Sequence, residues 1–222
     1  MSVVPLVLEG SPRSPRNVVE TEQEFHAAGG INGFSVLIRN LDREQLLAQD
    51  KTNVSYDLRV GEEYRDHRDT GKKPLRESED IVLRPGAAVI VETEEYFHLP
   101  RTLFGHIVPR VTLLQEGLSN TSSKVDPGYF GHLLITVFNL GKQEIKIRRK
   151  EKFCCLYLLH VSGEVRPYDK PPKRIEGLAT KRPWDHIRDR LEANNGLISA
   201  ILILATLILT LAQLISLFHG RP

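Results

Sequence analysis

The feature that most constrains this chain is an apolar run near its C-terminus. Residues 197–218 read LISAILILATLILTLAQLISLF, with no charged side chain and only Ser, Thr and Gln as polar interruptions. A helix of this length would be about 33 Å long, enough to cross the hydrocarbon core of a bilayer. A helix buried in a protein core is the alternative, but it would need a much larger protein around it, because the run is apolar on every side. The sequence therefore predicts a transmembrane helix over residues 195–218.

The basic residues around this run predict its orientation. The residues before it are Lys181, Arg182, Arg188 and Arg190, and Arg221 alone follows it. Because basic residues gather on the cytoplasmic side of membrane helices, the large N-terminal part is expected in the cytoplasm. The predicted localisation is thus a single-pass membrane protein, with the lipid bilayer as a partner.

Strand signals dominate the chain between residues 31 and 165. The segment SYDLRVG places Tyr56, Leu58 and Val60 on one face, and IVLRPGAAVIVETEEYFHL reads as two strands around Pro85 and Gly86. Further short apolar runs, HLLITVFNLG and EIKIRRKEKFCCLYLLHV, follow at close intervals, whereas residues 62–80 are polar and indicate a long loop. Many short strands separated by Gly and Pro predict a mainly β fold, a barrel or a sandwich.

The remaining segments flank this β domain. Residues 1–30 show no clear period and are interpreted as a partly ordered extension, and residues 166–194 form a basic, proline-containing linker. The basic side chains of the linker would either lie against anionic headgroups or, more economically, belong to a solvated spacer. The formal net charge of +2 argues against a nucleic acid partner, since such proteins have a strong basic bias.

The two cysteines, Cys154 and Cys155, are adjacent. Neighbours on a strand point to opposite faces, so these two do not readily form a disulfide with each other, and they are interpreted as a small apolar pair in a core strand. The chain has no CxxC and no HxE motif, so no zinc-deaminase site is expected. Free cysteines fit a reducing compartment.

Three segments, taken in order, carry a family resemblance. They are NVSYDLRVG (53–61), LRPGAAVIVETEEYFHLPRTLFGHIVPRVTLLQEGL (83–118) and KVDPGYFGHLLITVFNLGK (124–142). Together they resemble the dCTP deaminase and dUTPase superfamily across about residues 50–165. The resemblance implies a distorted β-barrel or jelly-roll subunit in a homotrimer, with sites for pyrimidine deoxynucleotides between subunits and Mg²⁺ bound with the triphosphate.

The resemblance also implies roles for two residues of the third segment. Asp126 stands where the family has an Asp that contacts the deoxyribose 3′-hydroxyl and, in dUTPases, helps to activate the attacking water. Tyr129 stands where an aromatic ring packs under the sugar and excludes a 2′-hydroxyl. The alternatives are an ordinary Asp-Pro-Gly turn for Asp126 and core packing for Tyr129.

The phosphate-binding residues implied by the resemblance are Arg110, Thr112, Gln115 and Lys124. A guanidinium and a hydroxyl both donate to phosphate oxygens, and Lys124 adds a further cation. The usual family pattern over residues 110–112 is Arg-Ser-Ser or Arg-Ser-Gly, whereas this chain has Arg110-Val111-Thr112. Loss of that hydroxyl predicts weakened phosphate binding.

The largest departure from the family lies at Thr136. Deaminases of this family have a catalytic Glu there that moves protons between water and the cytosine amine, and a threonine hydroxyl cannot accept that proton near neutral pH. The chain also lacks the Gly-rich C-terminal motif with which dUTPases wrap the phosphates, since its tail EGLATKRP holds only Gly177.

Three functions remain open at this point. The first is a membrane-anchored protein that binds pyrimidine deoxynucleotides without catalysis. The second is an active hydrolase, cleaving dUTP to dUMP and pyrophosphate or, with less support, deaminating dCTP. The third is a structural or interaction domain with a vestigial pocket, which a pocket filled by Val111 or Phe130 would favour.

Overall fold

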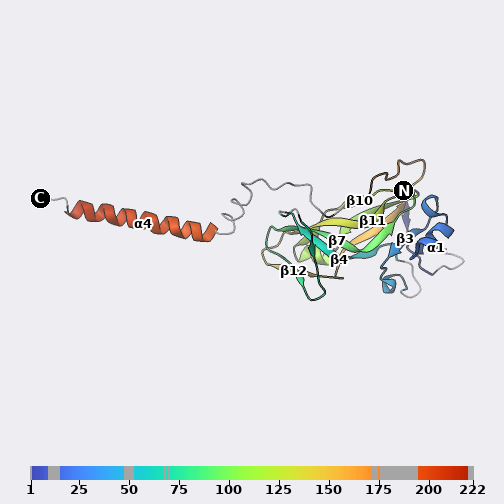
Figure 1. Cartoon of the computed structure of the whole chain (residues 1–222), viewed down its shortest axis with the longest axis horizontal. Coiled ribbons are helices and arrows are strands. Elements are labelled where there is room, and N and C mark those ends of the chain that lie inside the picture. The colour runs from blue at the N-terminus through green and yellow to red at the C-terminus, as the bar shows by residue number, and fades with distance from the viewer. Residues whose placement is uncertain are drawn as a thin grey trace. The chain divides into compact units, whose positions relative to one another are not determined.

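The structure is a computed structural model that describes residues 2–9, 16–47, 53–67, 69, 71–171, 175 and 195–219. The chain divides into two compact units, residues 1–178 and 179–222, and each is described by itself (Figure 1). Most of the predicted linker over 166–194 lies outside the described residues.

The first unit is built mainly of strands, as the sequence predicts. The helices among its described residues are short. In chain order the elements are β1 (Ser2–Val4), β2 (Val18–Val19), α1 (Glu22–Ala27), η1 (Gly30–Asn32), β3 (Val36–Arg39), η2 (Arg43–Gln45), β4 (Tyr56–Asp66), β5 (Lys73–Pro74), β6 (Asp80–Leu83), β7 (Ala88–His98), β8 (Leu103–Pro109), α2 (Val111–Gln115), β9 (Leu118–Asn120), β10 (Ser123–Val125), β11 (Phe130–Asn139), β12 (Ile145–Arg148) and β13 (Lys152–His160).

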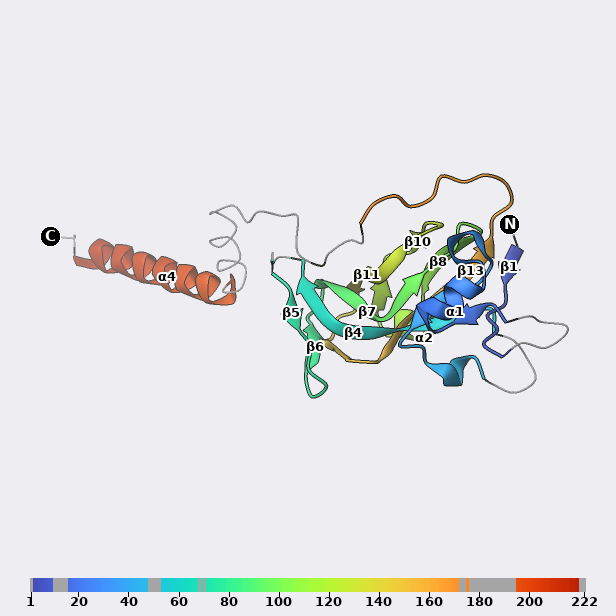
Figure 2. The ribbon, with the colours of Figure 1, turned by 45° about the vertical axis from the view of Figure 1, so that its right-hand side comes forward.

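One large sheet has the main path β10-β8-β13-β4-β7-β11-β9, with β1, β2, β3 and β5 paired to it off this path, and β12 pairs with β6 in a separate sheet. Figure 2 labels most strands of the large sheet. Each long strand alternates buried and partly exposed side chains. The buried set forms one core, which includes Leu58, Val91, Ile135 and Leu156. This alternation is the period-2 pattern by which the strands were predicted.

The extension over residues 1–30 contributes to the sheet. β1 pairs with β13, and β2 pairs in parallel with β3. Helix α1 begins with a capping box, in which the Thr21 hydroxyl accepts from the Glu24 amide while the Glu24 carboxylate accepts from the Thr21 amide. Phe25 anchors the helix in a small buried cluster with Val19 and Leu37.

Strands β4 and β7 approach each other closely at Gly61. A Cβ atom added to Gly61 would lie 2.8 Å from the carbonyl oxygens of Glu92 and Thr93. The β4–β7 register is irregular over the same stretch, between Val60 and Tyr64. The absence of a side chain at position 61 therefore permits the close backbone contact in the middle of the sheet.

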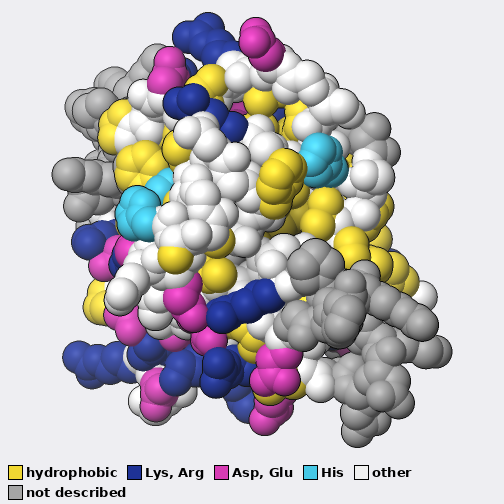
Figure 3. All heavy atoms as spheres, turned by 90° about the vertical axis from the view of Figure 1, so that its right-hand side faces the viewer, with side chains coloured by type: hydrophobic (Ala, Val, Ile, Leu, Met, Phe, Trp, Pro, Cys, Tyr) yellow, Lys and Arg dark blue, Asp and Glu magenta, His cyan; other side chains and the backbone are white. Residues whose placement is uncertain are grey.

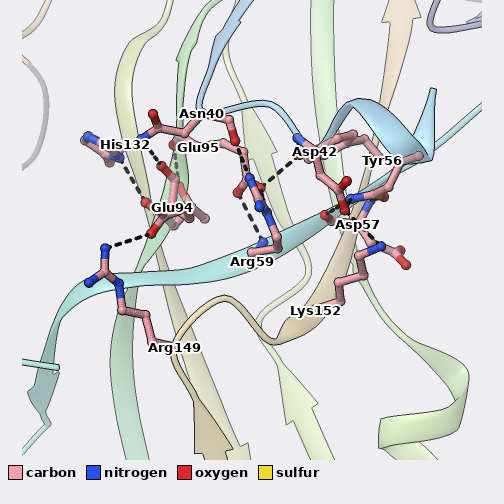
Figure 4. A network of polar contacts seen from close by, with 12 residues as sticks. Asn40, Asp42, Tyr56, Asp57, Arg59, Glu94, Glu95, His132, Arg149 and Lys152 are labelled. Atoms are coloured by element: carbon pink, nitrogen blue, oxygen red, sulfur yellow. Dashed lines mark hydrogen bonds and ion pairs between the residues drawn. The ribbon is translucent and has the colours of Figure 1, made fainter. Parts of the chain in front are cut away.

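A buried charge lies on the inner side of β7. The Glu95 carboxylate is fully buried and accepts from the Arg59 guanidinium at 2.7 Å and from the Tyr56 hydroxyl at 3.0 Å (Figure 4). Burial raises the pKa of Glu95, and the hydrogen bonds from Arg59 oppose that shift. Glu94, the preceding residue, lies on the other face, 3.8 Å from Arg149. Glu94 and Glu95 thus lie on opposite faces of β7 and have different arginine partners.

Several sequence-based expectations can now be compared with the structure. The turn at Pro85 and Gly86 separates β6 from β7, with Gly86 at a φ of 75°, as predicted. The loop predicted over residues 62–80 is wrong at both ends, because β4 continues to Asp66 and β5 and β6 follow. Cys154 and Cys155 are free thiols on β13, and Cys154 is buried in the core, as predicted. Cys155 is only half-buried and its thiol donates to Asp57, so the expected apolar pair is wrong for this residue.

The described part of the second unit is helix α4 (Asn195–His219), which matches the predicted helical segment in position. No helix in the part of the chain that the structure describes is both long enough and apolar enough to cross a bilayer. The predicted localisation, a single-pass membrane protein with its N-terminal domain in the cytoplasm, is therefore wrong. Neither the transmembrane helix nor the bilayer as a partner is supported.

Both charge signs are mixed on one face of the molecule. On the face shown in Figure 3, acidic side chains lie among the basic ones, and apolar side chains and histidines lie between them. This face therefore has no broad region of a single charge.

Candidate functional site

The turn between β10 and β11 contains Asp126 and Tyr129, the two residues expected to contact the sugar. The Tyr129 amide donates to the Asp126 carbonyl at 3.0 Å, which closes the Asp-Pro-Gly turn. Gly128 has a φ of 80°, in the left-handed region that favours glycine. The backbone of this turn therefore fixes Asp126 and Tyr129 relative to each other.

Asp126, Tyr129 and Lys124 line one pocket of about 220 Å³. The Lys124 ammonium lies 2.7 Å from the Asp126 carboxylate, whose side chain is 36% exposed. The other residues that line the pocket are Ile107, Ser123, Val125, Leu133, Leu134 and Tyr168. The pocket has an apolar wall and a charged pair at one side, the usual composition of a small-molecule site.

Tyr129 forms a buried wall of this pocket. Its hydroxyl donates to the His132 carbonyl at 2.5 Å, and its ring packs edge-on against Tyr168 at 5.2 Å between centroids. Burial, followed by the nearby Tyr168 and Glu92, raises the pKa of Tyr129. The phenol therefore stays neutral, and its hydroxyl is already engaged by the His132 carbonyl.

Arg110 lies elsewhere, immediately before α2. Its guanidinium donates to the Lys152 carbonyl at 3.0 Å and lies 3.6 Å from the Asp57 carboxylate. The Cys155 thiol donates to the other oxygen of Asp57 at 2.8 Å, and burial together with this contact raises the pKa of Cys155 to about 12. The side chain of Arg110 is thus held from β4 and β13 and does not line the pocket.

Helix α2 carries the other expected phosphate ligands. Thr112 and Gln115 are both exposed, and neither lines the pocket with Asp126. Val111 is 68% exposed and Phe130 36% exposed, and neither of them fills the pocket. The structure therefore brings Lys124, Asp126 and Tyr129 together, separates Arg110, Thr112 and Gln115 from them, and leaves the pocket open.

Thr136 lies on the outer face of β11, opposite Ile90 of β7. Its carbonyl accepts from the Thr121 amide at 2.9 Å. No carboxylate is present at this position, so the side chain has no group that titrates near neutral pH.

Sequence reasoning missed Tyr168 and Asp57. Tyr168 lies in the expected linker, yet its amide donates to the Pro127 carbonyl at 2.7 Å and its ring lines the pocket. Asp57 alternates with the apolar residues of SYDLRVG, a position that indicates only the polar side of a strand. An aromatic residue isolated among Pro and charged residues was the available signal for Tyr168, whereas no sequence signal links Asp57 to Arg110.

A protein-family comparison identifies the class to which this chain belongs. The model of the dCTP deaminase-like family matches residues 32–161, more than half of the chain. The chain belongs to the dCTP deaminase-like family, and the superfamily resemblance inferred from the three segments is confirmed.

Named relatives give the same assignment. The chain is 25% identical over 163 residues to a dCTP deaminase, dUMP-forming, from Methanothermobacter thermautotrophicus, covering 64% of this chain and 82% of that protein. It is 32% identical to a dCTP deaminase from Pyrobaculum calidifontis, covering 54% and 81%. A dCTP deaminase from Pyrococcus furiosus is 31% identical, with 52% and 73% covered.

Solved structures give weaker likenesses. A 2′-deoxycytidine 5′-triphosphate deaminase from Agrobacterium tumefaciens aligns with a TM-score of 0.45 and 19% identity, covering 55% of this chain and 43% of that one. A dUTPase of Staphylococcus bacteriophage 80alpha aligns with a TM-score of 0.43 and 15% identity, covering 63% and 99%. The family assignment rests on the sequence match and not on these likenesses.

Proposed function

We propose that this protein binds a pyrimidine deoxynucleotide in the pocket at the β10–β11 turn. The observation that carries this proposal is the grouping of Lys124, Asp126 and Tyr129 around one pocket. Asp126 accepts a hydrogen bond from the sugar 3′-hydroxyl, and the Tyr129 ring packs under the sugar. The relatives named as dCTP deaminases support a cytosine or uracil nucleotide as the ligand.

A neighbouring subunit completes the site in this proposal. The pocket of about 220 Å³ is smaller than the 300–1,000 Å³ typical of small-molecule sites. A distorted-barrel homotrimer brings the exposed α2 of one subunit toward the pocket of the next. Arg110, Thr112 and Gln115 then bind the phosphates from across the interface, where charge-assisted hydrogen bonds favour them.

Magnesium accompanies the triphosphate in this proposal. The described residues contain no group of three or more His, Cys, Asp or Glu side chains arranged to hold a metal ion. Mg²⁺ at triphosphates is commonly held by phosphate oxygens, water and only one or two carboxylates. The ion would therefore be carried by phosphate oxygens and water, and it would neutralise phosphate charge.

Binding without deamination is the form of the proposal that Thr136 supports. A hydroxyl cannot carry the proton between water and the cytosine amine, so the protein holds the nucleotide without converting it. Hydrolysis of dUTP is the second candidate, because the part-exposed Asp126 carboxylate can orient a water molecule. In that reaction water attacks the α-phosphorus, the bond to the bridging oxygen breaks, and dUMP and pyrophosphate leave.

Calorimetry on the full chain with Mg²⁺ and dCTP, dUTP or dTTP tests binding. We expect micromolar or tighter binding of at least one of these nucleotides and no binding of the matching ribonucleotide. Absence of binding by all three refutes the proposal. If the unaltered chain releases pyrophosphate from dUTP and Asp126→Asn does not, the function is hydrolysis of dUTP and not binding alone.

A further inference from the structure

The outer face of β11 leads away from the proposed sugar site. Leu134 and Thr136 follow each other on this face, because alternate residues of a strand share a side. In the register with β7, Leu134 lies opposite Glu92 and Thr136 lies opposite Ile90. Glu92 is therefore the direct neighbour of Leu134 and lies diagonally across from Thr136, at about 7 Å.

Two observations connect Glu92 with the pocket. Leu134, its cross-strand partner, is one of the lining residues. The charge of Glu92 also contributes to raising the pKa of Tyr129, after burial and Tyr168, so the carboxylate lies within electrostatic range of that phenol. Glu92 thus lies directly across from a residue that lines the pocket.

Glu92 also differs from the two other glutamates of the same stretch. Glu95 is bound by Arg59, and Glu94 lies beside Arg149 (Figure 4). The Glu92 carboxylate forms no hydrogen bond or ion pair within the described ranges of the chain, and it is only half-buried. It therefore keeps its acceptor capacity for a ligand.

The charges around Glu92 come from several elements. Burial raises its pKa first, the nearby Glu63 and Glu62 of β4 add to the rise, and His132 of β11 and Lys72 oppose it. A half-buried carboxyl with like charges near it is unfavourable for the free protein. Donation of a hydrogen bond by a ligand would relieve that cost.

We propose that Glu92 is the residue that reads the 4-position of the pyrimidine base. With the sugar held at Asp126 and Tyr129, the base extends along Leu134 toward Glu92. A carboxylate there accepts a hydrogen bond from the exocyclic amine of cytosine and faces the carbonyl lone pairs of uracil or thymine unfavourably. This assignment rests on the proposed function, because it requires a bound deoxynucleotide.

The expected effect is a preference between two nucleotides that differ at one group. A good side-chain contact to a base edge discriminates by about 10- to 100-fold. The full chain with Mg²⁺ is therefore expected to bind dCTP at least about tenfold more tightly than dUTP. In Glu92→Gln the amide can donate to the uracil carbonyl as well as accept, so the ratio of the two dissociation constants should fall to about threefold or less.

A matched control separates this contact from the general field. Glu63→Gln removes one negative charge close to Glu92 on β4, where Glu63 pairs with Lys72 at 2.7 Å. It leaves the carboxylate of Glu92 in place, so the preference for dCTP should stay within about twofold of the unaltered chain. Glu92→Asp is the second variant if Glu92→Gln does not fold, and its shorter carboxylate should give an intermediate ratio.

The possible outcomes distinguish this inference from the proposed function. Tight binding of both nucleotides with equal affinity, or an unchanged ratio in Glu92→Gln or Glu92→Asp, overturns the role of Glu92 and leaves the proposed function intact. Failure of the unaltered chain to bind dCTP, dUTP and dTTP overturns both. If Glu63→Gln also loses the preference for dCTP over dUTP, the preference comes from the electrostatic field of the acidic residues and not from a direct contact by Glu92, which overturns the inference.

Discussion

The turn that leads into β11 and helix α2 differ in how firmly the protein holds them. The turn is closed by a backbone hydrogen bond, and its Tyr129 is buried between the core and Tyr168. Helix α2 has five residues, no side-chain cap at Arg110 and an exposed Val111. A preformed surface binds with little ordering cost, whereas an exposed short helix gains its contacts only with a partner or a ligand. The sugar side of the proposed site is thus preformed, whereas the expected phosphate ligands lie apart from it.

The largest effect is expected at the turn, in Asp126→Asn. Replacing a charged acceptor with a neutral one should weaken the binding of every deoxynucleotide, and of the deoxynucleoside, by about 10- to 100-fold. Calorimetry with dCTP and deoxycytidine measures it, and Asp80→Asn on β6 is the control. Binding within threefold of the unaltered chain would remove the difference between the turn and α2.

Arg110→Ala should have the next largest effect and a different profile. Loss of the guanidinium should weaken triphosphate binding by about tenfold and leave binding of the deoxynucleoside unchanged, because a charge-assisted contact to phosphate is lost. Titrations with both ligands measure this contrast. Arg148→Ala, an exposed arginine on β12, serves as the control, and an equal loss for the nucleoside would mean that Arg110 shapes the sugar side instead.

Tyr168→Ala tests how the turn is held. Loss of the ring pair with Tyr129 should lower the free energy of unfolding by about 1 kcal/mol, measured by denaturant titration. Tyr168→Phe keeps the ring and loses only the hydrogen bond to the Pro171 carbonyl at 3.0 Å, so it should stay close to the unaltered chain. Equal stability of the alanine variant would show that the turn does not depend on this contact.

The smallest effects are expected on α2 itself. Thr112→Ala should weaken triphosphate binding by about threefold, and Val111→Ser should tighten it by about the same factor by restoring a hydroxyl donor. Competition titrations with dCTP detect changes of this size. A tenfold loss of triphosphate affinity in Thr112→Ala would mean that α2 contributes as much to binding as the turn does.

The strands and the turn of the β domain follow from local pattern. Alternation in β7 and β11, and the Asp-Pro-Gly sequence before Tyr129, place these elements without tertiary information. The capping box at Thr21 and Glu24 was also readable, but the extension was interpreted only from its lack of period.

Contacts between distant residues were beyond sequence reasoning. Arg110 is held by Asp57, which lies more than fifty positions earlier, and Tyr168 returns to the turn from a segment expected to be a spacer. Neither contact leaves a periodic signal, because each depends on how β4, β13 and the chain after β13 pack together. The same reason hides Glu92, whose position beside Leu134 follows only from the strand register.

The bare backbone at Gly61 has a consequence for the evolution of this domain. Any side chain there would collide with the carbonyl groups of Glu92 and Thr93, so β4 and β7 would have to separate at that step. In a comprehensive mutational scan, position 61 should tolerate almost no replacement although it bears no functional group. Around Glu92, the proposed base contact, side chains can therefore change during evolution, whereas the spacing between β4 and β7 cannot.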